Sequence, residues 1–409
     1  MSIRLVSVFG LAAVLALPAL GIDEAHKQKA QEIAGKATTW LKSQQDKATG
    51  GWSVPPAEGS PHLPGITGLV VTGMLLDPKA EQAAPSILQG VKYMLNFQQA
   101  DGGIYDKMLP SYNTSLALSA LSKSTLPQAK DAIVPAQEFL KKLQIWDGAT
   151  PVTEGGVGGA DGPKPVGKDH PFYGGVGYGK HGRPDGSNVQ MFVQALHDSG
   201  VSPSDDSMQR AVAFMQRLQM LDKVNDMPYA DGSKQGGFVY ATVENAQSVD
   251  ARGGQSQAGM IEESLDDGTK VSRLRCYGSM SYAGFKSYLY AELPRNDDRV
   301  QAALGWIKGN YTLEENPAMG TDGLYYYFVS FSRALSAWGE PILEVASAEK
   351  SADGKPVTKK VDWANDLIDR LGMLQNADGS FKAVDDRWME NNQVLITAYA
   401  LIAVREASK

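Results

Sequence analysis

A helix pair that is repeated along the chain is the feature that most constrains its fold. The clearest copy is VKYMLNFQQADGGIY at residues 91–105, followed by SYNTSLALSALSK at 111–123. The first half is amphipathic and ends in Gln-Gln, a Gly-rich turn and an aromatic residue, whereas the second half carries little charge. The same pattern closes the protein, in NDLIDRLGMLQNADGSFKA and NNQVLITAYALIAVREA. Because stacked repeats share one continuous core, the 409 residues predict a single extended domain over 22–409.

Helix-sized segments alternate in character along the chain. The amphipathic set is 24–46, 80–99, 128–145, 204–221, 297–310 and 360–376. The set poor in charge and rich in small residues is 64–77, 111–124, 187–199, 278–293, 323–338 and 391–406. An amphipathic helix has one solvent face, whereas a helix that is apolar nearly all round is buried. The alternation therefore predicts an all-α fold, an α6/α6 toroid whose charged helices form the outer ring and whose small-residue helices form the inner ring. An open solenoid is the competing arrangement, but a solenoid needs polar end repeats, and both terminal pairs resemble the middle ones.

A Gln-Gly-aromatic pattern joins each outer segment to the next inner one. Examples are Gln44-Gln45 before Trp52, Gln98-Gln99 before Tyr105, Gln219 before Phe238, and Gln375 before Phe381. The amide can reach unpaired carbonyls at its own helix end, and the glycines permit the left-handed turn that ends a helix. We interpret the pattern as structural stapling.

Three insertions break the period. Residues 147–186 are Gly-rich and predict a long loop that would serve as a lid. Residues 235–276 contain GGFVYATV and KVSRLRCY around a Leu-Asp-Asp-Gly turn, which predicts a β-hairpin. Residues 340–361 predict a second short hairpin, from PILEV and PVTKKV.

Residues 1–21 have the pattern of a signal peptide. MSIR is positively charged, LVSVFGLAAVLALPAL is apolar, and Ala19-Leu20-Gly21 fits a small-x-small cleavage site. The apolar run is short for a membrane span, which needs about 20 residues. We therefore expect export to the periplasm or the outside of a bacterial cell, with no membrane span after cleavage. An uncleaved anchor is the alternative.

Charge and cysteine content exclude several classes of protein. The formal net charge of −7 favours solubility and argues against a nucleic-acid partner. Cys276 is the single cysteine, so the chain has neither an internal disulfide nor a Cys-x-x-Cys site. The histidines show no His-x-x-x-His spacing, and zinc needs three or four converging ligands. We therefore expect no metal and no cofactor.

Several phrases resemble known families. The Gln-to-Trp element at 44–52 resembles the QW-type repeats of squalene–hopene cyclases, whose α/α toroid is shared with the β-subunits of protein prenyltransferases. Longer phrases are similar to exported bacterial prenyltransferase/squalene oxidase repeat-containing proteins. They are GGVGYGKHGRPDGSNVQMFVQAL, YGSMSYAGFKSYLYAEL, YTLEENPAMGTDGLYYYF and DRWMENNQVLITAYALIA. The resemblance covers nearly all of the mature chain and implies a terpenoid-cyclase-like toroid.

The chain departs from these families in the motifs that carry their chemistry. Class II terpene cyclases protonate an alkene with an Asp-x-Asp-Asp motif, which is absent here. Prenyltransferases hold zinc with an Asp-x-Cys pair, but Leu274 stands two residues before Cys276. If the protein is an enzyme of this type, its acid is non-standard, and Asp185 and Asp386 are the candidates.

The toroid would bring the N-terminal ends of the inner helices to one mouth of the barrel. The candidate ligand-cavity residues there are Tyr112, Asn113, Arg183, Asp185, Asn188, Tyr282, Tyr326, Tyr327, Trp388, Glu390 and Asn391. Aromatic side chains with a few polar groups suit an amphipathic or isoprenoid-like ligand. The alternative is that these residues cap helices and fill the ring.

Three functions follow from this sequence. The first is an exported toroid that binds a hydrophobic, isoprenoid- or lipid-like ligand in its lumen. The second is a terpene cyclase or prenyl transferase with a non-standard acid. The third is a non-catalytic repeat scaffold that binds a protein or a cell-wall glycan at the mouth. A deep, closed aromatic lumen would favour the first two, and a lumen plugged by side chains would favour the third.

Overall fold

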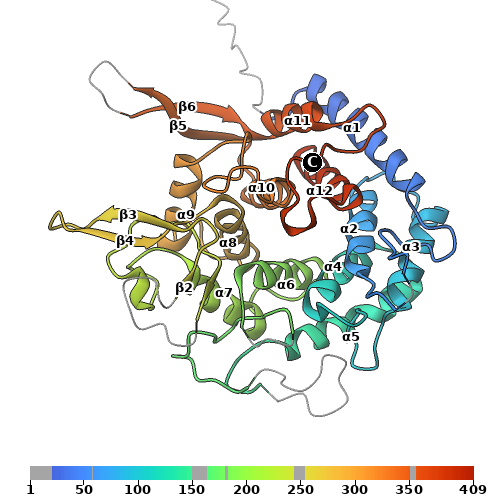
Figure 1. Ribbon diagram of the computed structural model, residues 1–409, viewed down its shortest axis with the longest axis horizontal. Coiled ribbons are helices and arrows are strands. Elements are labelled where there is room, and N and C mark those ends of the chain that lie inside the picture. The colour runs from blue at the N-terminus through green and yellow to red at the C-terminus, as the bar shows by residue number, and fades with distance from the viewer. Residues whose placement is uncertain (1–20, 58, 150–163, 180–182, 244–253, 351–355) are drawn as a thin grey trace, which may run out of the picture.

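Two concentric rings of helices make up the structure, a computed structural model that describes residues 21–57, 59–149, 164–179, 183–243, 254–350 and 356–409 (Figure 1). The outer helices are α1 (Glu24–Ser43), α3 (Pro85–Leu95), α5 (Pro127–Lys142), α7 (Asp206–Leu218), α9 (Asp298–Gly309) and α11 (Trp363–Leu374). The inner helices are α2 (Pro64–Leu75), α4 (Pro110–Lys123), α6 (Gly186–Asp198), α8 (Gly278–Tyr290), α10 (Leu324–Trp338) and α12 (Gln393–Ala407). The predicted α6/α6 toroid is confirmed.

The inner ring is closed by its last helix. α12 packs against α10 on one side and against α2 on the other, and α1 packs against both α11 and α12 (Figure 1). Every residue of α2 is buried, as expected for a helix that has neighbours all round. Because the first and last inner helices are in contact, the ring is closed, and the alternative arrangement as an open solenoid is excluded.

Four of the junction glutamines bond more widely than the sequence suggested. Gln144 Nε2 donates to the carbonyl of Gly174 at 3.0 Å and to that of Ser207, in α7, at 2.9 Å. Equivalent bonds run from Gln45 to Gly50 and Ser86, from Gln219 to Gly236 and Arg299, and from Gln375 to Gly379 and Ile33. The prediction that the amide serves its own helix end was wrong for these glutamines, because each one links the following turn to the next outer helix.

The residue at the end of the junction is tied to an inner helix. The backbone N–H of Trp52 donates to Thr67 Oγ1 at 3.0 Å, and that of Phe381 donates to Thr397 Oγ1 at 3.2 Å. Phe238 N–H donates in the same way to Ser281 Oγ. These aromatic side chains are fully buried, so the stapling interpretation is confirmed.

The insertions form two-stranded sheets. β5 (Ile342–Lys350) and β6 (Pro356–Asp362) make the predicted hairpin. β4 (Lys270–Leu274) pairs with β3 (Met260–Ser264), the segment directly before the Asp-Gly turn. The predicted partner GGFVYATV was wrong: its Phe238 is fixed in a junction, and only Ala241–Thr242 (β1) pairs, with Gly254–Gln255 (β2).

Two expectations fall wholly or partly outside the described residues. The predicted signal peptide lies there except for Gly21, and so does much of the Gly-rich insertion, at 150–163 and 180–182. Within the part of the chain that is described, no helix combines the length and apolar character of a membrane span.

Candidate functional site

The inner helices begin side by side at one mouth, because polar side chains from one helix start bond the backbone of the next. Asn113 Oδ1, in α4, accepts from Gly65 N–H, in α2, at 2.9 Å. Asn316 Oδ1, just before α10, accepts from Ser279 N–H of α8 at 2.9 Å. The first N–H groups of a helix have no partner within the helix, and these contacts satisfy them. Asn113 is therefore a cap that ties two helices together.

Glu390 caps a neighbouring helix in the same way, with a carboxyl group in place of an amide. It lies just before α12 and is 1% exposed, and its Oε1 and Oε2 accept from the N–H groups of Tyr326 (2.9 Å) and Tyr325 (3.2 Å). α10 itself starts after Gly323, which has no side chain to cap it. Burial raises the pKa of Glu390 to about 7, although the backbone bonds oppose that rise. The mouth thus holds a carboxyl that titrates near neutrality.

Asp185, a predicted candidate acid, is the N-cap of α6. Its Oδ1 accepts from Asn188 N–H at 3.0 Å and from Ser187 Oγ at 2.6 Å, and its Oδ2 accepts from Asn188 Nδ2 at 2.8 Å. Burial raises the pKa of this carboxyl. Asp386, the other candidate, is exposed on the rim before α12. The geometry of Asp185 is that of a cap, and an acid role for either residue stays a prediction.

Tyrosines cross the lumen just inside the mouth. The Tyr326 hydroxyl, on α10, accepts from Gln190 Nε2, on α6, at 2.6 Å, although α8 separates these helices in the ring. The rings of Tyr326 and Tyr399 lie 6.1 Å apart, and Tyr112 stacks on Tyr178 at 6.3 Å. Described side chains therefore span the lumen at this level.

Two predicted cavity residues lie elsewhere. The ring centroids of Tyr282 and Tyr327 are 5.5 Å apart, both residues are buried, and the Tyr327 hydroxyl donates to the Thr312 carbonyl. They pack with Phe331, which in turn contacts Trp363 of the outer ring. Tyr327 follows Tyr326 on α10, and neighbouring positions on a helix point to different faces, so these contacts place Tyr327, with Tyr282 of α8 packed against it, in the core on the side of the outer ring.

Trp388 forms an exposed platform on the rim. It is 47% exposed, its ring lies against Gly323, and the Arg387 guanidinium sits 4.4 Å from its centroid. Arg387 also contacts Asp322 and donates to Gln257 Oε1. The predicted Asn391 is exposed nearby, whereas Arg183 donates to Gln255 Oε1 beside the Tyr240 ring.

Backbone strain is concentrated at this mouth. Six non-glycine residues in the described part of the chain have positive φ, and five of them lie in loops that enter inner helices. They are Ser53, Leu109, Ala318, Trp388 and Met389. Such residues cost about 1–3 kcal/mol each and cluster at binding and catalytic sites. The consecutive pair Trp388 and Met389 directly precedes Glu390.

Deeper in the lumen is a polar ladder that sequence reasoning missed. Lys286 Nζ donates to Gln190 Oε1 at 2.6 Å and to Gln194 Oε1 at 2.8 Å. Arg333 lies on the neighbouring helix α10. The available signal was that both cations stand within helices that otherwise carry no charge.

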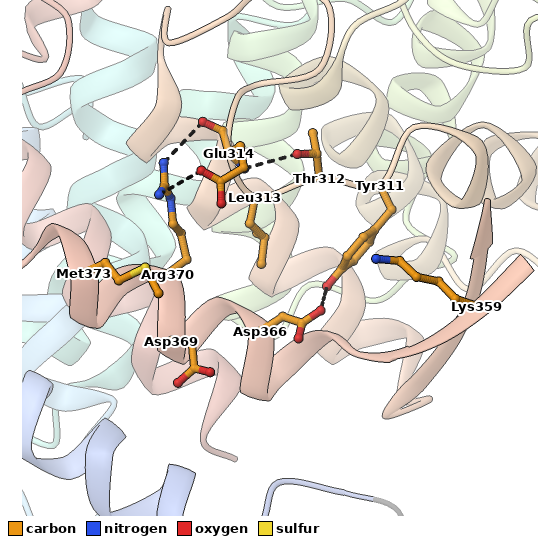
Figure 2. A pocket seen from close by; sticks show the side chains of 9 residues that line it. All are labelled: Tyr311, Thr312, Leu313, Glu314, Lys359, Asp366, Asp369, Arg370 and Met373. Atoms are coloured by element: carbon orange, nitrogen blue, oxygen red, sulfur yellow. Dashed lines mark hydrogen bonds and ion pairs between the residues drawn. The ribbon is translucent and has the colours of Figure 1, made fainter. Parts of the chain in front are cut away.

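A separate groove of about 300 Å³ lies on the outer surface, between residues 311–314 and α11 (Figure 2). The Tyr311 hydroxyl donates to Asp366 at 2.9 Å, and Arg370 pairs with Glu314 at 2.9 Å. These polar groups satisfy one another, so the mouth is the stronger candidate site. In the described residues, no cluster of His, Cys, Asp and Glu is arranged to hold a metal ion. Cys276 is buried, which raises its pKa well above the ordinary value.

Comparison with known proteins supports the fold. No protein-family model matches the chain, and no curated protein matches it. An inactive variant of an alpha-1,6-mannanase from Salegentibacter sp., solved with alpha-1,6-mannotriose, is similar at a TM-score of 0.54 and 6% identity, covering 93% of this chain and 100% of that one. An alpha-amylase from Clostridium perfringens is similar at 0.52 and 10% identity, covering 91% and 97%.

A terpene cyclase is also found, at lower similarity. The type II terpene cyclase from Scytonema, solved with merosterolic acid A, has a TM-score of 0.36 and 13% identity, and the match covers 95% of this chain and 99% of that one. At these identities the comparisons show the α/α toroid fold alone. The fold that the sequence resemblance implied is confirmed, but a specific likeness to prenyltransferases is not supported.

Proposed function

We propose that this protein binds a carbohydrate chain at the mouth of the toroid. The exposed, strained Trp388 platform carries the proposal. The flat face of an indole packs against the C–H face of a sugar ring, while neighbouring polar groups bond its hydroxyls. Arg387, whose guanidinium lies over the indole ring, and the exposed Asn391, three residues after Trp388 in the chain, supply such groups.

The lumen gives less support to an isoprenoid ligand. Its described side chains include the Gln190–Tyr326 bond across the ring and the buried Lys286 ammonium. An apolar chain in that position would separate these polar groups from their partners without replacing the bonds, which is unfavourable. This arrangement matches the plugged lumen that favours a scaffold with its ligand at the mouth.

One further observation and one prediction agree with a glycan ligand. The toroid is shared with a mannanase solved with a mannotriose and with an alpha-amylase, so the fold accommodates carbohydrate recognition. The predicted export would place the mouth in contact with cell-wall or extracellular glycans. The proposal is for binding: Asp185 and Glu390 both serve helix starts, so hydrolysis by a pair of free carboxyl groups is not part of it.

The test is binding to an array of bacterial, fungal and plant polysaccharides, followed by calorimetry with an oligosaccharide of the class that binds. We expect Trp388→Ala to weaken binding at least tenfold, roughly 1.4 kcal/mol, while Trp388→Phe keeps most of the affinity. Met373→Ala, at an exposed position on the outer helix α11, is the control and should leave binding unchanged. No binding by the natural protein, or equal affinity in Trp388→Ala, would refute the proposal.

A further inference from the structure

Two buried cationic side chains lie in the lumen, on the neighbouring helices α8 and α10. Lys286 on α8 is 1% exposed and Arg333 on α10 is 3% exposed. The ammonium of Lys286 bonds only the neutral oxygens of Gln190 and Gln194, and it lies 5.6 Å from the Tyr290 ring. Arg333 Nε has no hydrogen-bond partner among the described residues, and its nearest carboxylate oxygen, on Glu406, lies 3.9 Å away in a long ion pair. Neither Lys286 nor Arg333 Nε therefore has a carboxylate within hydrogen-bond distance in the described residues.

The acids near these cations already have partners. Asp198 pairs with Lys123 at 3.0 Å, and Glu406 pairs with Lys409. Next to Glu406 in α12, Arg405 pairs with Asp77 at 2.6 Å. Each of these acids has a closer cation than Lys286 or Arg333, although Glu406 also faces Arg333. A buried cation without a hydrogen-bonded anion is unfavourable, so the placement of Arg333 and Lys286 requires an explanation.

Helix dipoles do not provide that explanation. The negative end of a helix attracts cations within its last turn only. Lys123, His197 and Arg405 occupy such last turns. Lys286 and Arg333 stand earlier in their helices, and neither α8 nor α10 has a basic residue in its last turn.

We propose that Arg333 and Lys286 form a binding site for an oxyanion in the lumen, between α8 and α10. A guanidinium matches the geometry of a carboxylate, phosphate or sulfate group, and the protonated Lys286 ammonium has one N–H donor beyond its two glutamine bonds. The anionic group is either a free ion or a substituent on a sugar. The site is separate from the Trp388 platform, so it stands or falls independently of glycan binding there.

The state of Lys286 gives a further signature. Burial, together with the neighbouring positive charge of Arg333, lowers the pKa of Lys286 well below its ordinary value, whereas Asp198 and Glu406 act in the opposite direction. A bound anion stabilises the charged ammonium. Binding should therefore take up protons, and the measured heat should depend on the ionisation enthalpy of the buffer.

The experiment is calorimetry of the purified protein with sodium sulfate, inorganic phosphate or sodium glucuronate at constant ionic strength, with glucose as the uncharged probe. We expect binding of at least one anion, with Arg333→Gln and Lys286→Met each weakening it at least tenfold. Arg405→Gln removes a cation that already has its own carboxylate, so it is the matched control and should retain binding. Sulfate or phosphate binding indicates a free oxyanion, and binding of glucuronate alone indicates an acidic sugar.

Absence of binding for all three anions, or unchanged affinity in both lumen variants, overturns the proposal. If the variants do not fold, crystals of the natural protein soaked in the anion that binds, with selenate replacing sulfate, give the answer. Density within hydrogen-bond reach of Arg333 supports the site, and an anion found only on the outer surface overturns it.

Discussion

At the scale of single residues, Glu390 shows how one side chain organises the mouth. It belongs to the loop before α12 but bonds the first N–H groups of α10, so a single carboxyl holds two inner helices together. The loop that delivers it contains the left-handed Trp388 and Met389. The position of the exposed indole therefore depends on the same contact.

Glu390 should make stability depend on pH. Its pKa is raised from 4.5 to about 7, so the folded state binds the proton more tightly than the unfolded state. Protonation of Glu390 therefore adds about 3 kcal/mol to the free energy of unfolding. This stabilisation is fully present below pH 4.5 and is lost as the pH rises through 7. We expect this part of the pH slope to be absent in Glu390→Gln and retained in Asp386→Asn, as measured by urea unfolding between pH 4.5 and 8. Parallel profiles for the natural protein and Glu390→Gln would contradict the assignment.

At the scale of elements, the junctions convert a run of helix pairs into a ring. Each linking glutamine bonds the turn after its own helix and the next outer helix, and Gln144 also accepts from Arg210 Nε at 2.7 Å. Neighbouring outer helices thus meet through buried amide bonds in addition to apolar contacts.

Removing one of these links should be costly. Gln144→Ala leaves the Gly174 and Ser207 carbonyls and the Arg210 guanidinium without their partner in a buried site, so we expect a loss of about 2–4 kcal/mol in unfolding free energy. Gln28→Ala, on the exposed face of α1, should change it by less than about 0.5 kcal/mol. Equal, small effects in urea denaturation would show that the glutamine link does not stabilise the ring.

At the scale of the whole molecule, closure makes the two ends of the chain support each other. α2 and α12 approach so closely that a Cβ at Gly73 would lie 2.9 Å from the Leu401 side chain. Lys29 of α1 also bonds Asp369 of α11 at 2.7 Å. A ring of this kind has no terminal repeat that can fray by itself.

A cavity at the α2–α12 seam should therefore act on both helices. Leu401 is fully buried, and Leu401→Ala should cost about 2–5 kcal/mol. In hydrogen exchange we expect protection to fall in α12 and also in α2, although about 330 residues separate them along the chain. Met373→Ala should leave both unchanged. Loss of protection confined to α12 would indicate that the helices behave as an open array.

The sequence by itself determined the twelve α-helices of the described part of the chain, their order and their two layers, because a charged face marks an outer helix and the absence of one marks an inner helix. It also located the mouth and the Trp388–Glu390 segment. It did not determine which tyrosine faces the lumen, since an inner helix is apolar on every side and its periodicity cannot distinguish the lumen from the space between the rings.

Only the tertiary structure decided the chemistry of the site. Glu390 meets Tyr326 across 64 residues of chain, and Lys286 meets Gln190 across 96. It also showed that Asp185 caps the start of α6 and that Tyr282 and Tyr327 pack in the core. The physical reason is that burial and hydrogen bonding set the state of a polar group, and both arise from neighbours that only the closed ring brings together.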